Sequence, residues 1–347
     1  MVTAIVGPAG LDMTQLDVGT LVLGTVTTET PTTYVDNYFG QISTFIGQGF
    51  TYDAFGYPTG GTVTGLQESF QGQVVYQVTG MSIPVSSWVA WANNDDTLSA
   101  FQTVFGGNDT VTGSIGADTL AAFSGDDSIS GGGGNDFLNG GPAVGALGTG
   151  NDTISGGTGN DTLGSVGGTN YLRGDDGDDS ISGGTGFDDA NGNMGNDTIH
   201  GNGGDDYSVG GKGNDLLFGD DGDDIVWGNL GDDTCDGGNG NDQVRGGQGD
   251  DSLSGGAGND FISGDRGNDT ESGGPGADIF HTFSGAGIDK VLDFHLSEGD
   301  RVMLDPGTVF TLIQQGADTV IDMGNGDQMI LVGVQLSTLT PGWIFGA

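Results

Sequence analysis

Residues 156–164 read Gly-Gly-Thr-Gly-Asn-Asp-Thr-Leu-Gly, and this nine-residue pattern recurs through the middle of the chain. Its sixth position is Asp161, and the same position of every other repeat is aspartate except at Asn170. A glycine lies two residues before each of these positions, and a mostly aliphatic residue lies two residues after it. A strict period of this kind predicts a solenoid, in which each repeat stacks on its neighbours.

The recurring aspartates form a shorter and a longer run. They are Asp109, Asp118, Asp127 and Asp136, and then Asp152, Asp161, Asp179, Asp188, Asp197, Asp206, Asp215, Asp224, Asp233, Asp242, Asp251, Asp260, Asp269 and Asp278. Asp136 and Asp152 are sixteen residues apart, where two full periods would span eighteen. We interpret the aspartate-free residues 141–147, near this break at 140–150, as a loop or bulge that divides the solenoid into two stacks.

Each repeat divides into a six-residue turn and a three-residue strand, and the turn predicts a metal site. Glycine allows the backbone to approach closely and to direct carbonyl oxygens inward, and the aspartate adds a carboxylate oxygen. Calcium prefers ligands that are all oxygen, whereas magnesium keeps its water shell and seldom enters a cage made only of protein. The nitrogen and sulfur ligands of zinc or copper are missing from these positions. We therefore expect multiple Ca²⁺ ions as the cofactor.

The strand part of the repeat predicts the core. Side chains alternate along a strand, so the aliphatic position points inward. Fifteen of the nineteen residues at this position are Val, Leu, Ile or Phe. Two repeats complete one turn, which gives two parallel sheets with rungs about 4.8 Å apart. A cation between rungs is shared by two aspartates, for example Asp161 and Asp179, and roughly fifteen ions is the upper estimate from this coordination.

Four residues depart from the pattern and mark where the solenoid is expected to be weakest. Asn170 removes one charge from its two sites. Ala190 and Ser208 lie one above the other, so the core is expected to be thin there. Glu271 places a carboxylate at an aliphatic position, and we expect it either to turn outward as the roll ends or to accompany distorted last units.

Composition narrows the possible partners. Six basic residues against 48 acidic ones give a formal charge of −42, which repels nucleic acid and anionic membranes. A charge of this size needs bound cations before a core can form. The single cysteine, Cys235, takes an aliphatic position and is expected to be a small buried hydrophobe. The chain has no apolar stretch long enough for a transmembrane segment, and its first residues lack the basic region of a Sec-type signal peptide.

Segments without repeats flank the solenoid. Residues 1–105 are expected to form a small β-rich domain, with strands around Val63 and Val74–Val78, turns at 59–62 and 79–80, and a helix near 86–105 at its end. Residues 106–287 form the repeat region. Residues 288–347 contain five short strand patterns and a Gly324-Asn325-Gly326 hairpin turn, and we expect them to cap the exposed last rung.

The pattern Gly-Gly-x-Gly-x-Asp-x-aliphatic-x resembles the RTX, or hemolysin-type, calcium-binding nonapeptide over roughly half of the chain. The resemblance implies an all-β protein with a parallel β-roll. It also implies that one turn supplies carbonyls from its second and fourth positions, the next turn supplies them from its first and third, and both supply their aspartates. The implied sets are Gly157, Gly159 and Asp161 with Gly174, Asp176 and Asp179, and Gly238, Gly240 and Asp242 with Gly255, Ala257 and Asp260.

The resemblance extends to the tail and implies a route of secretion. Residues 276–280, 293–294 and 298–302 are similar to the junction and cap that follow such rolls. In this family an uncleaved C-terminal signal directs type I secretion to the outside of the cell. We therefore expect a secreted, extracellular or cell-surface protein.

Residues 1–105 contain no His, Lys, Arg or Cys, and the chain has no His-Glu-x-x-His motif, so we do not expect an enzyme. The first hypothesis is a structural, self-assembling or adhesive component of a bacterial surface layer or biofilm matrix, in a homo-oligomer or extracellular assembly. The second is a non-catalytic calcium-binding module of an enzyme, or a small enzyme, acting on an extracellular polysaccharide. The third is an adhesin whose aromatic N-terminal domain binds sugar. A surface polysaccharide is thus a possible partner.

Overall fold

The structure is a computed structural model that describes strands at 3–6, 25–30, 33–38, 41–52, 58–70 and 73–84, and then residues 107–141 and 150–346. The chain divides into two compact units, residues 1–167 and 168–347, which are described separately below. Both units consist of strands and their connections, apart from one short 3₁₀ helix among the described residues, η3 at Leu336–Thr338. Within the described part of the chain, no helix is long and apolar enough to cross a membrane.

Unit 1 begins with an antiparallel sheet, which confirms the β-rich character expected of residues 1–105. Its strands pair in the order β2-β3-β4-β5-β6-β1. They span Thr25–Thr30 (β2), Thr33–Tyr38 (β3), Gln41–Tyr52 (β4), Pro58–Phe70 (β5), Gln73–Pro84 (β6) and Thr3–Val6 (β1). The expected helix near 86–105 lies outside the described residues.

The prediction of glycine-containing turns at 59–62 and 79–80 is wrong. Residues 59–62 lie inside β5 and residues 79–80 lie inside β6. The β5–β6 register shifts between Val63 and Gly65, whose partners are Ile83 and Thr79. A register shift of this kind is a β-bulge, in which one strand of the pair has extra residues, and glycine within a long strand often marks one. The glycines therefore bend a continuous strand instead of ending it.

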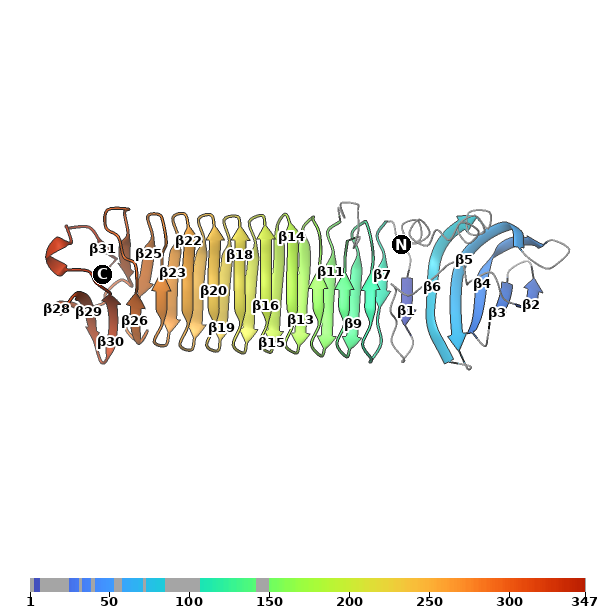
Figure 1. Ribbon diagram of the computed structural model, residues 1–347, viewed down its shortest axis with the longest axis horizontal. Helices are drawn as coiled ribbons and strands as arrows, with labels where there is room; N and C mark the ends of the chain where they lie inside the picture. Colours follow the sequence, from blue (N-terminus) through green and yellow to red (C-terminus); the bar gives the residue numbers. More distant parts are fainter. Residues whose placement is uncertain are drawn as a thin grey trace. The chain divides into compact units, whose positions relative to one another are not determined.

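The first part of the roll follows in the same unit. One sheet continues from β1 through β7 (Thr110–Thr112), β9 (Ser128–Gly133) and β11 (Thr153–Thr158), all in parallel register. The other contains β8 (Thr119–Ala121), β10 (Phe137–Asn139) and β12 (Thr162–Gly164). Strands that pair are therefore two repeats apart, as expected for two parallel sheets wound by one chain (Figure 1).

The break near residues 140–150 does not divide the solenoid into two stacks, so that interpretation is wrong. β9 pairs with β11 and β10 pairs with β12 across it, and Ile129 lies beside Ile154 in the ladder. Hydrogen-bonded aspartates on either side are 25 residues apart in sequence, against 18 elsewhere in this unit. The extra residues are accommodated in one connection because loop length costs little compared with the loss of strand pairing.

Unit 2 contains the rest of the roll as two parallel sheets, which we name by their first strands. The β13 sheet contains β13 (Asn170–Asp176), β15 (Asp188–Met194), β17 (Tyr207–Lys212), β19 (Ile225–Leu230), β21 (Gln243–Gln248), β23 (Phe261–Arg266), β25 (Ile279–Thr282), β27 (Arg301–Leu304) and β31 (Ile344–Phe345). The β14 sheet contains β14 (Ser180–Thr185), β16 (Thr198–Gly203), β18 (Leu216–Asp221), β20 (Thr234–Asn239), β22 (Ser252–Ala257), β24 (Thr270–Ser272) and β26 (Ile288–Val291). Figure 1 shows strands of the two sheets alternating along the row.

Most roll strands are longer than the three residues that the sequence predicts. β20, for example, covers six residues, and its pairing with β22 includes Gly238 beside Gly256. The glycines at the start of each turn therefore belong to the sheet as well as to the turn. Longer strands give each rung more backbone hydrogen bonds than a three-residue strand could make.

The core is a row of side chains at the aliphatic position. Leu120, Leu163, Ile199, Val226 and Ile262 are each at most 1 % exposed. Cys235 is buried in the same row, as expected. Ala190 pairs with Ser208 in neighbouring strands, which confirms that the two small residues are adjacent on one sheet. Because side chains on neighbouring rungs touch, the two small residues leave less apolar surface in contact at this point.

The end of unit 2 is a β cap on the last rung. β26 pairs with β30 (Asp327–Leu331), which continues through β29 (Asp318–Gly324) to β28 (Thr311–Gln315) in antiparallel hairpins. Asn325 and Gly326 have φ values of 58° and 101°, as a two-residue hairpin turn requires, so the predicted turn is confirmed. Phe280, Phe294 and Trp343 pack together over the end of the core.

Candidate calcium sites along the roll

The recurring aspartates form a continuous hydrogen-bonded ladder within each unit. Each of them is at most 3 % exposed. The Oδ1 atom of one aspartate accepts a hydrogen bond from the backbone N–H of the aspartate one turn earlier, at 2.7–3.1 Å, as in Asp206 to Asp224 and Asp242 to Asp260. The turns therefore stack their carboxylates in register, at nearly identical geometry from rung to rung.

In most of these aspartates, no described protein atom forms a hydrogen bond with the second carboxylate oxygen. The Oδ2 atom is buried and has no hydrogen-bond partner among the described residues in twelve of these aspartates. They are Asp127, Asp136, Asp197, Asp206, Asp215, Asp224, Asp233, Asp242, Asp251, Asp260, Asp269 and Asp278. A buried carboxylate oxygen without a partner is costly, because it has lost its water and gained nothing in return. A cation held by the ladder would remove this cost.

In six of these turns a backbone carbonyl lies next to the Oδ2 atom, in the space that a larger residue than glycine would occupy. The six are the turns of Asp136, Asp206, Asp224, Asp233, Asp242 and Asp260. An added Cβ at Gly201 would lie 2.6 Å from Asp206 Oδ2 and 2.6 Å from the carbonyl oxygen of Gly219 on the next turn. At Gly255 the corresponding distances are 2.5 Å to Asp260 Oδ2 and 2.8 Å to the Gly273 carbonyl. A carboxylate and a carbonyl oxygen thus converge beside the first glycine of the turn. This is the donor set that calcium takes, so the residues fit the ion.

The electrostatics point the same way. Burial raises the carboxyl pKa of Asp127 to about 8, and the charges of Asp152 and Asp109 add to the effect. Burial, with the neighbouring carboxylates, raises the pKa of Asp197 and Asp242 to about 7. Backbone N–H donors lower these pKa values in part but do not offset the burial. Without a metal, the folded roll therefore holds its aspartates in an environment that resists their charge.

The carbonyl ligands implied for the second set lie in positions that allow the predicted coordination. Asp242 and Asp260 are neighbours in the ladder, and Gly238 and Gly240 both have positive φ. The Ala257 carbonyl already accepts a hydrogen bond from Gly240 N–H at 2.9 Å, and a carbonyl has a second lone pair for a metal. Ligation of calcium by these atoms stays a prediction.

The first implied set is divided between the two units. Gly157, Gly159 and Asp161 belong to unit 1, whereas Gly174, Asp176 and Asp179 belong to unit 2. Gly157 and Gly159 have positive φ, and Asp179 Oδ2 lies against Gly174 as in the other turns. Each half therefore has the local geometry of the repeat, and the coordination that would join the halves stays a prediction.

Asn170 keeps the ladder but changes its chemistry. Its side-chain amide donates to Asp188 Oδ1 at 2.7 Å, and its backbone N–H donates to the same oxygen at 2.9 Å. The expected loss of one charge is thus accompanied by an extra hydrogen bond to the next aspartate.

Glu271 does not turn outward, so that alternative is wrong. Its side chain is fully buried between Leu253 and Val291 on the neighbouring rungs. Oε1 accepts a hydrogen bond from Gly264 N–H at 2.8 Å, and Oε2 has no partner among the described residues. Burial, together with the charge of Asp289, raises the pKa of Glu271 well above its ordinary value. The alternative of altered last units fits better, because the ladder spacing changes just after this residue.

Two ladder members, Asp289 and Asp300, were missed by the sequence reasoning. Asp289 Oδ1 accepts from Asp269 N–H at 3.3 Å, and Asp300 Oδ1 accepts from Asp278 N–H at 3.1 Å. Both are 1 % exposed. They follow their partners by 20 and 22 residues instead of 18, so a fixed period does not reach them. The local signal, an aspartate two residues before an inward valine, is present at Asp289-Lys290-Val291 and Asp300-Arg301-Val302.

Among the described residues, no three Asp, Glu, His or Cys side chains group together as one metal site. The candidate sites therefore depend on two carboxylates at most, and backbone carbonyls have to complete the shell. This division favours a large, flexible oxygen-seeking ion such as calcium over zinc, which takes side-chain nitrogen and sulfur.

Comparison with known proteins agrees with this geometry. The family model of the RTX calcium-binding nonapeptide repeat matches residues 104–141 and 147–271, in overlapping copies. No curated protein matches the chain. Among solved structures, the crystal structure of the extracellular lipase LipA from Serratia marcescens is 15 % identical over 95 % of this chain and 85 % of that chain, with a TM-score of 0.25. A TM-score this low carries no argument about this chain.

The family match covers the stacked aspartate ladder from Asp109 to Asp269. RTX repeats bind calcium and are typical of secreted proteins. The resemblance suggested by the nonapeptide pattern is confirmed, together with the parallel β-roll that it implies. Residues 104–141 and 147–271 are RTX calcium-binding nonapeptide repeats, and the chain is therefore an RTX-repeat protein.

Proposed function

We propose that this protein is secreted by a type I system, folds on extracellular calcium, and serves as a structural, self-assembling or adhesive component of a bacterial surface or biofilm matrix. The observation that carries the proposal is the ladder of buried aspartates, twelve of which have an Oδ2 atom without a hydrogen-bond partner among the described residues. Such a ladder is unfavourable where calcium is scarce and favourable where it is abundant. It therefore couples folding to the outside of the cell.

The switch follows from the charge. At −42, the chain repels itself, and stacking the aspartates concentrates that repulsion inside the roll. Each calcium brings two positive charges to a pair of carboxylates, so ligation and folding become one event. We expect the roll to be disordered at submicromolar calcium and folded at millimolar calcium. Circular dichroism with excess chelator and with calcium tests this, and the same β signal in both conditions would refute it.

Self-assembly is supported by the edge of the N-terminal sheet. Among the described strands, β2 pairs only with β3, so no described strand occupies its other edge. An open edge is a template for a strand from another chain. Electron microscopy of the full chain with and without calcium tests this part: assemblies that need calcium support it, and dispersed particles in both conditions contradict it.

We propose a non-catalytic role. The support is compositional: residues 1–105, the largest segment outside the roll and its cap, lack the His, Lys, Arg and Cys side chains that most hydrolases use as bases or nucleophiles. A screen of purified protein against extracellular polysaccharides and esters tests this, and calcium-dependent turnover of any of them would overturn it.

A further inference from the structure

The outer faces of the two sheets in unit 2 differ in chemistry. Five of the six basic residues of the chain lie on strands of the β13 sheet, and the sixth, Lys290, lies on β26 of the β14 sheet. The five are Arg173, Lys212, Arg245, Arg266 and Arg301. The calcium-binding pattern leaves outward positions free to vary, so this one-sided distribution is not required by the roll.

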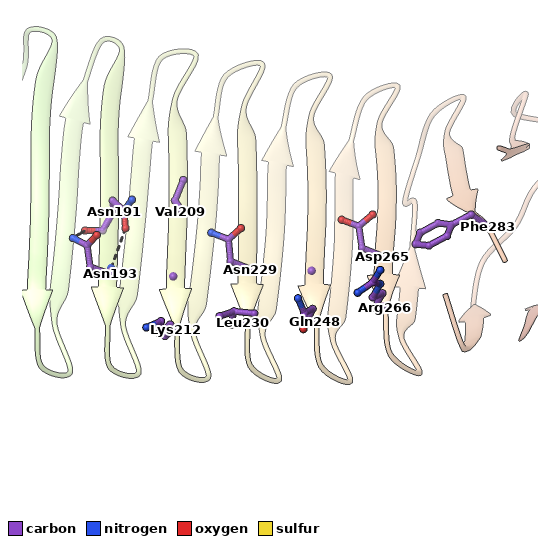
Figure 2. Close-up of a pocket in the computed structure, with 12 residues that line it drawn as sticks. Asn191, Asn193, Val209, Lys212, Asn229, Leu230, Gln248, Asp265, Arg266 and Phe283 are labelled. Atoms are coloured by element: carbon purple, nitrogen blue, oxygen red, sulfur yellow. Dashed lines mark hydrogen bonds between the residues drawn. The ribbon is translucent and has the colours of Figure 1, made fainter. Parts of the chain in front are cut away.

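A shallow groove of about 650 Å³ crosses the β13 sheet, from β15 to Phe283 (Figure 2). We call it the amide groove, because Asn191, Asn193, Asn229 and Gln248 line it together with Lys212 and Arg266. Figure 2 shows these side chains in one row across successive strands. The groove of similar size on the β14 sheet also contains amides, Asn202 and Asn239, but its charges are acidic: Asp220, Asp221 and Asp236 line it, and no Lys or Arg does.

The two cations of the amide groove are available to a ligand. Arg173 is held by Asp189 at 3.0 Å and Arg245 by Asp265 at 3.8 Å. By contrast, neither Lys212 nor Arg266 forms an ion pair with another described residue, and both are exposed. Asp265 is the one acidic residue that lines the groove, and Arg245 and the Ser263 hydroxyl already bind its carboxylate. The groove thus has two unpaired positive charges on a chain of formal charge −42.

The spacing and the neutral residues indicate the kind of ligand. Lys212 and Arg266 lie on β17 and β23, three rungs apart, which corresponds to roughly 14 Å. Between them, Asn229 and Gln248 offer amides that both donate and accept hydrogen bonds, as sugar hydroxyls do. The volume is that of a small-ligand site and not of a protein interface. An extended chain with hydroxyls throughout and carboxylates at intervals fits this arrangement.

We propose that the amide groove binds an acidic polysaccharide, with Lys212 and Arg266 each holding a uronate carboxylate and the amides between them holding hydroxyls. The inference goes beyond the proposed function, since it requires only the folded roll and not assembly or secretion. The exposed Leu230 and the half-buried Phe283, which also line the groove, supply apolar contacts for the faces of sugar rings.

The test measures binding of the full chain in saturating calcium to a short oligogalacturonate. Lys212→Gln and Arg266→Gln are each expected to weaken binding roughly tenfold, the usual effect of one charge-assisted hydrogen bond. Lys290→Gln removes the same charge from the opposite sheet and is expected to leave binding unchanged. Circular dichroism of each variant in calcium shows whether the roll is folded. If one groove variant does not fold, the other still tests the proposal.

Three results would overturn the proposal. The first is an undetectable affinity of the unmodified protein for the oligogalacturonate. The second is an equal affinity of Lys290→Gln and the two groove variants: an equal loss would show a general charge effect, and no loss in any of them would show bridging by calcium. The third is equal binding of a control compound. Equal binding of a carboxyl-reduced oligosaccharide would show that Lys212 and Arg266 do not recognise carboxylates, and equal binding of polyglutamate would show that the groove does not recognise sugar. None of these results depends on whether the protein assembles, so failure here and failure of the proposed function are distinguishable.

Discussion

Replacing Gly201 by alanine tests whether the first glycine of a turn is required by the calcium site. Gly201 does not have the positive φ that favours glycine, so backbone conformation alone permits alanine. The added Cβ would instead lie 2.6 Å from both Asp206 Oδ2 and the Gly219 carbonyl, where ordinary contact begins at 3.4 Å. Both oxygens would have to move by about 0.8 Å. These are the two atoms that we assign to the ion.

The expected cost has two parts. Forcing a methyl group into a packed site costs about 1–3 kcal/mol. Displaced ligands weaken a metal site by about 10–100-fold, or roughly 1.4–2.7 kcal/mol. We therefore expect Gly201→Ala to lower the stability of the calcium-loaded protein by about 2–5 kcal/mol and to shift its calcium titration to higher concentration.

Gly203→Ala is the matched control, because it lies in the same turn. The nearest atom to its added Cβ is the Asp221 carbonyl oxygen at 4.0 Å, and its φ is also not positive. This variant is expected to be unchanged or more stable by about 0.4–1 kcal/mol, through the lower entropy of its unfolded chain. Denaturant unfolding in calcium and calcium titration followed by circular dichroism are the measurements. Equal behaviour of the two variants would refute the assignment of Asp206 Oδ2 and the Gly219 carbonyl to a metal site.

Three further predictions follow from the ladder and its end. In the absence of calcium, the pKa of Asp197 and Asp242 is about 7 in the folded roll, against 3.8 in the unfolded chain, so the folded roll binds more protons between about pH 4 and 7. The stability of the calcium-free roll therefore falls as the pH rises through this window, and circular dichroism without calcium should show more β structure near pH 5 than near pH 8. A β signal that is equal or larger near pH 8 would count against the burial of these carboxylates. Asp269→Asn, at a ladder carboxylate whose Oδ2 atom has no partner among the described residues, is expected to weaken or abolish binding of one calcium ion in isothermal titration. Asp305→Asn, at an exposed carboxylate, is expected to leave the stoichiometry unchanged, and equal titrations would remove Asp269 from the set of ligands. Glu271→Gln keeps the acceptor for Gly264 N–H and removes a buried carboxylate, so it is expected to raise the unfolding free energy at neutral pH by about 1–3 kcal/mol, and an unchanged or lower value would show that a partner compensates Oε2.

The sequence alone predicted the features that repeat at a fixed position within nine residues. The glycine before each aspartate and the aliphatic residue after it depend only on local geometry, because a turn and a strand alternate and side chains alternate within the strand. The β-roll, its row of core residues and the oxygen chemistry of its turns were therefore predictable. The hairpin at Asn325 and Gly326 was predictable for the same local reason.

Other features of the fold and of the sites depended on which strands pair with one another. Strand pairing is continuous where the hydrogen-bonded aspartates are 25, 20 and 22 residues apart instead of 18, at 136–161, 269–289 and 278–300. A longer connection costs less free energy than the loss of strand pairing. A fixed period could therefore neither join the two runs of aspartates nor include Asp289 and Asp300. Burial of Glu271 likewise depends on the rungs on both sides of it.

The amide groove is the clearest case of a feature that only the tertiary structure decided. Lys212, Asn229, Gln248 and Arg266 are 17 to 19 residues apart in sequence and resemble unrelated variable positions of the repeat. Two repeats per turn bring them onto one face, beside one another on β17, β19, β21 and β23. The calcium ligands are a property of each repeat, and so the sequence shows them. A binding face is a property of the stack, and it exists only once the rungs are in register.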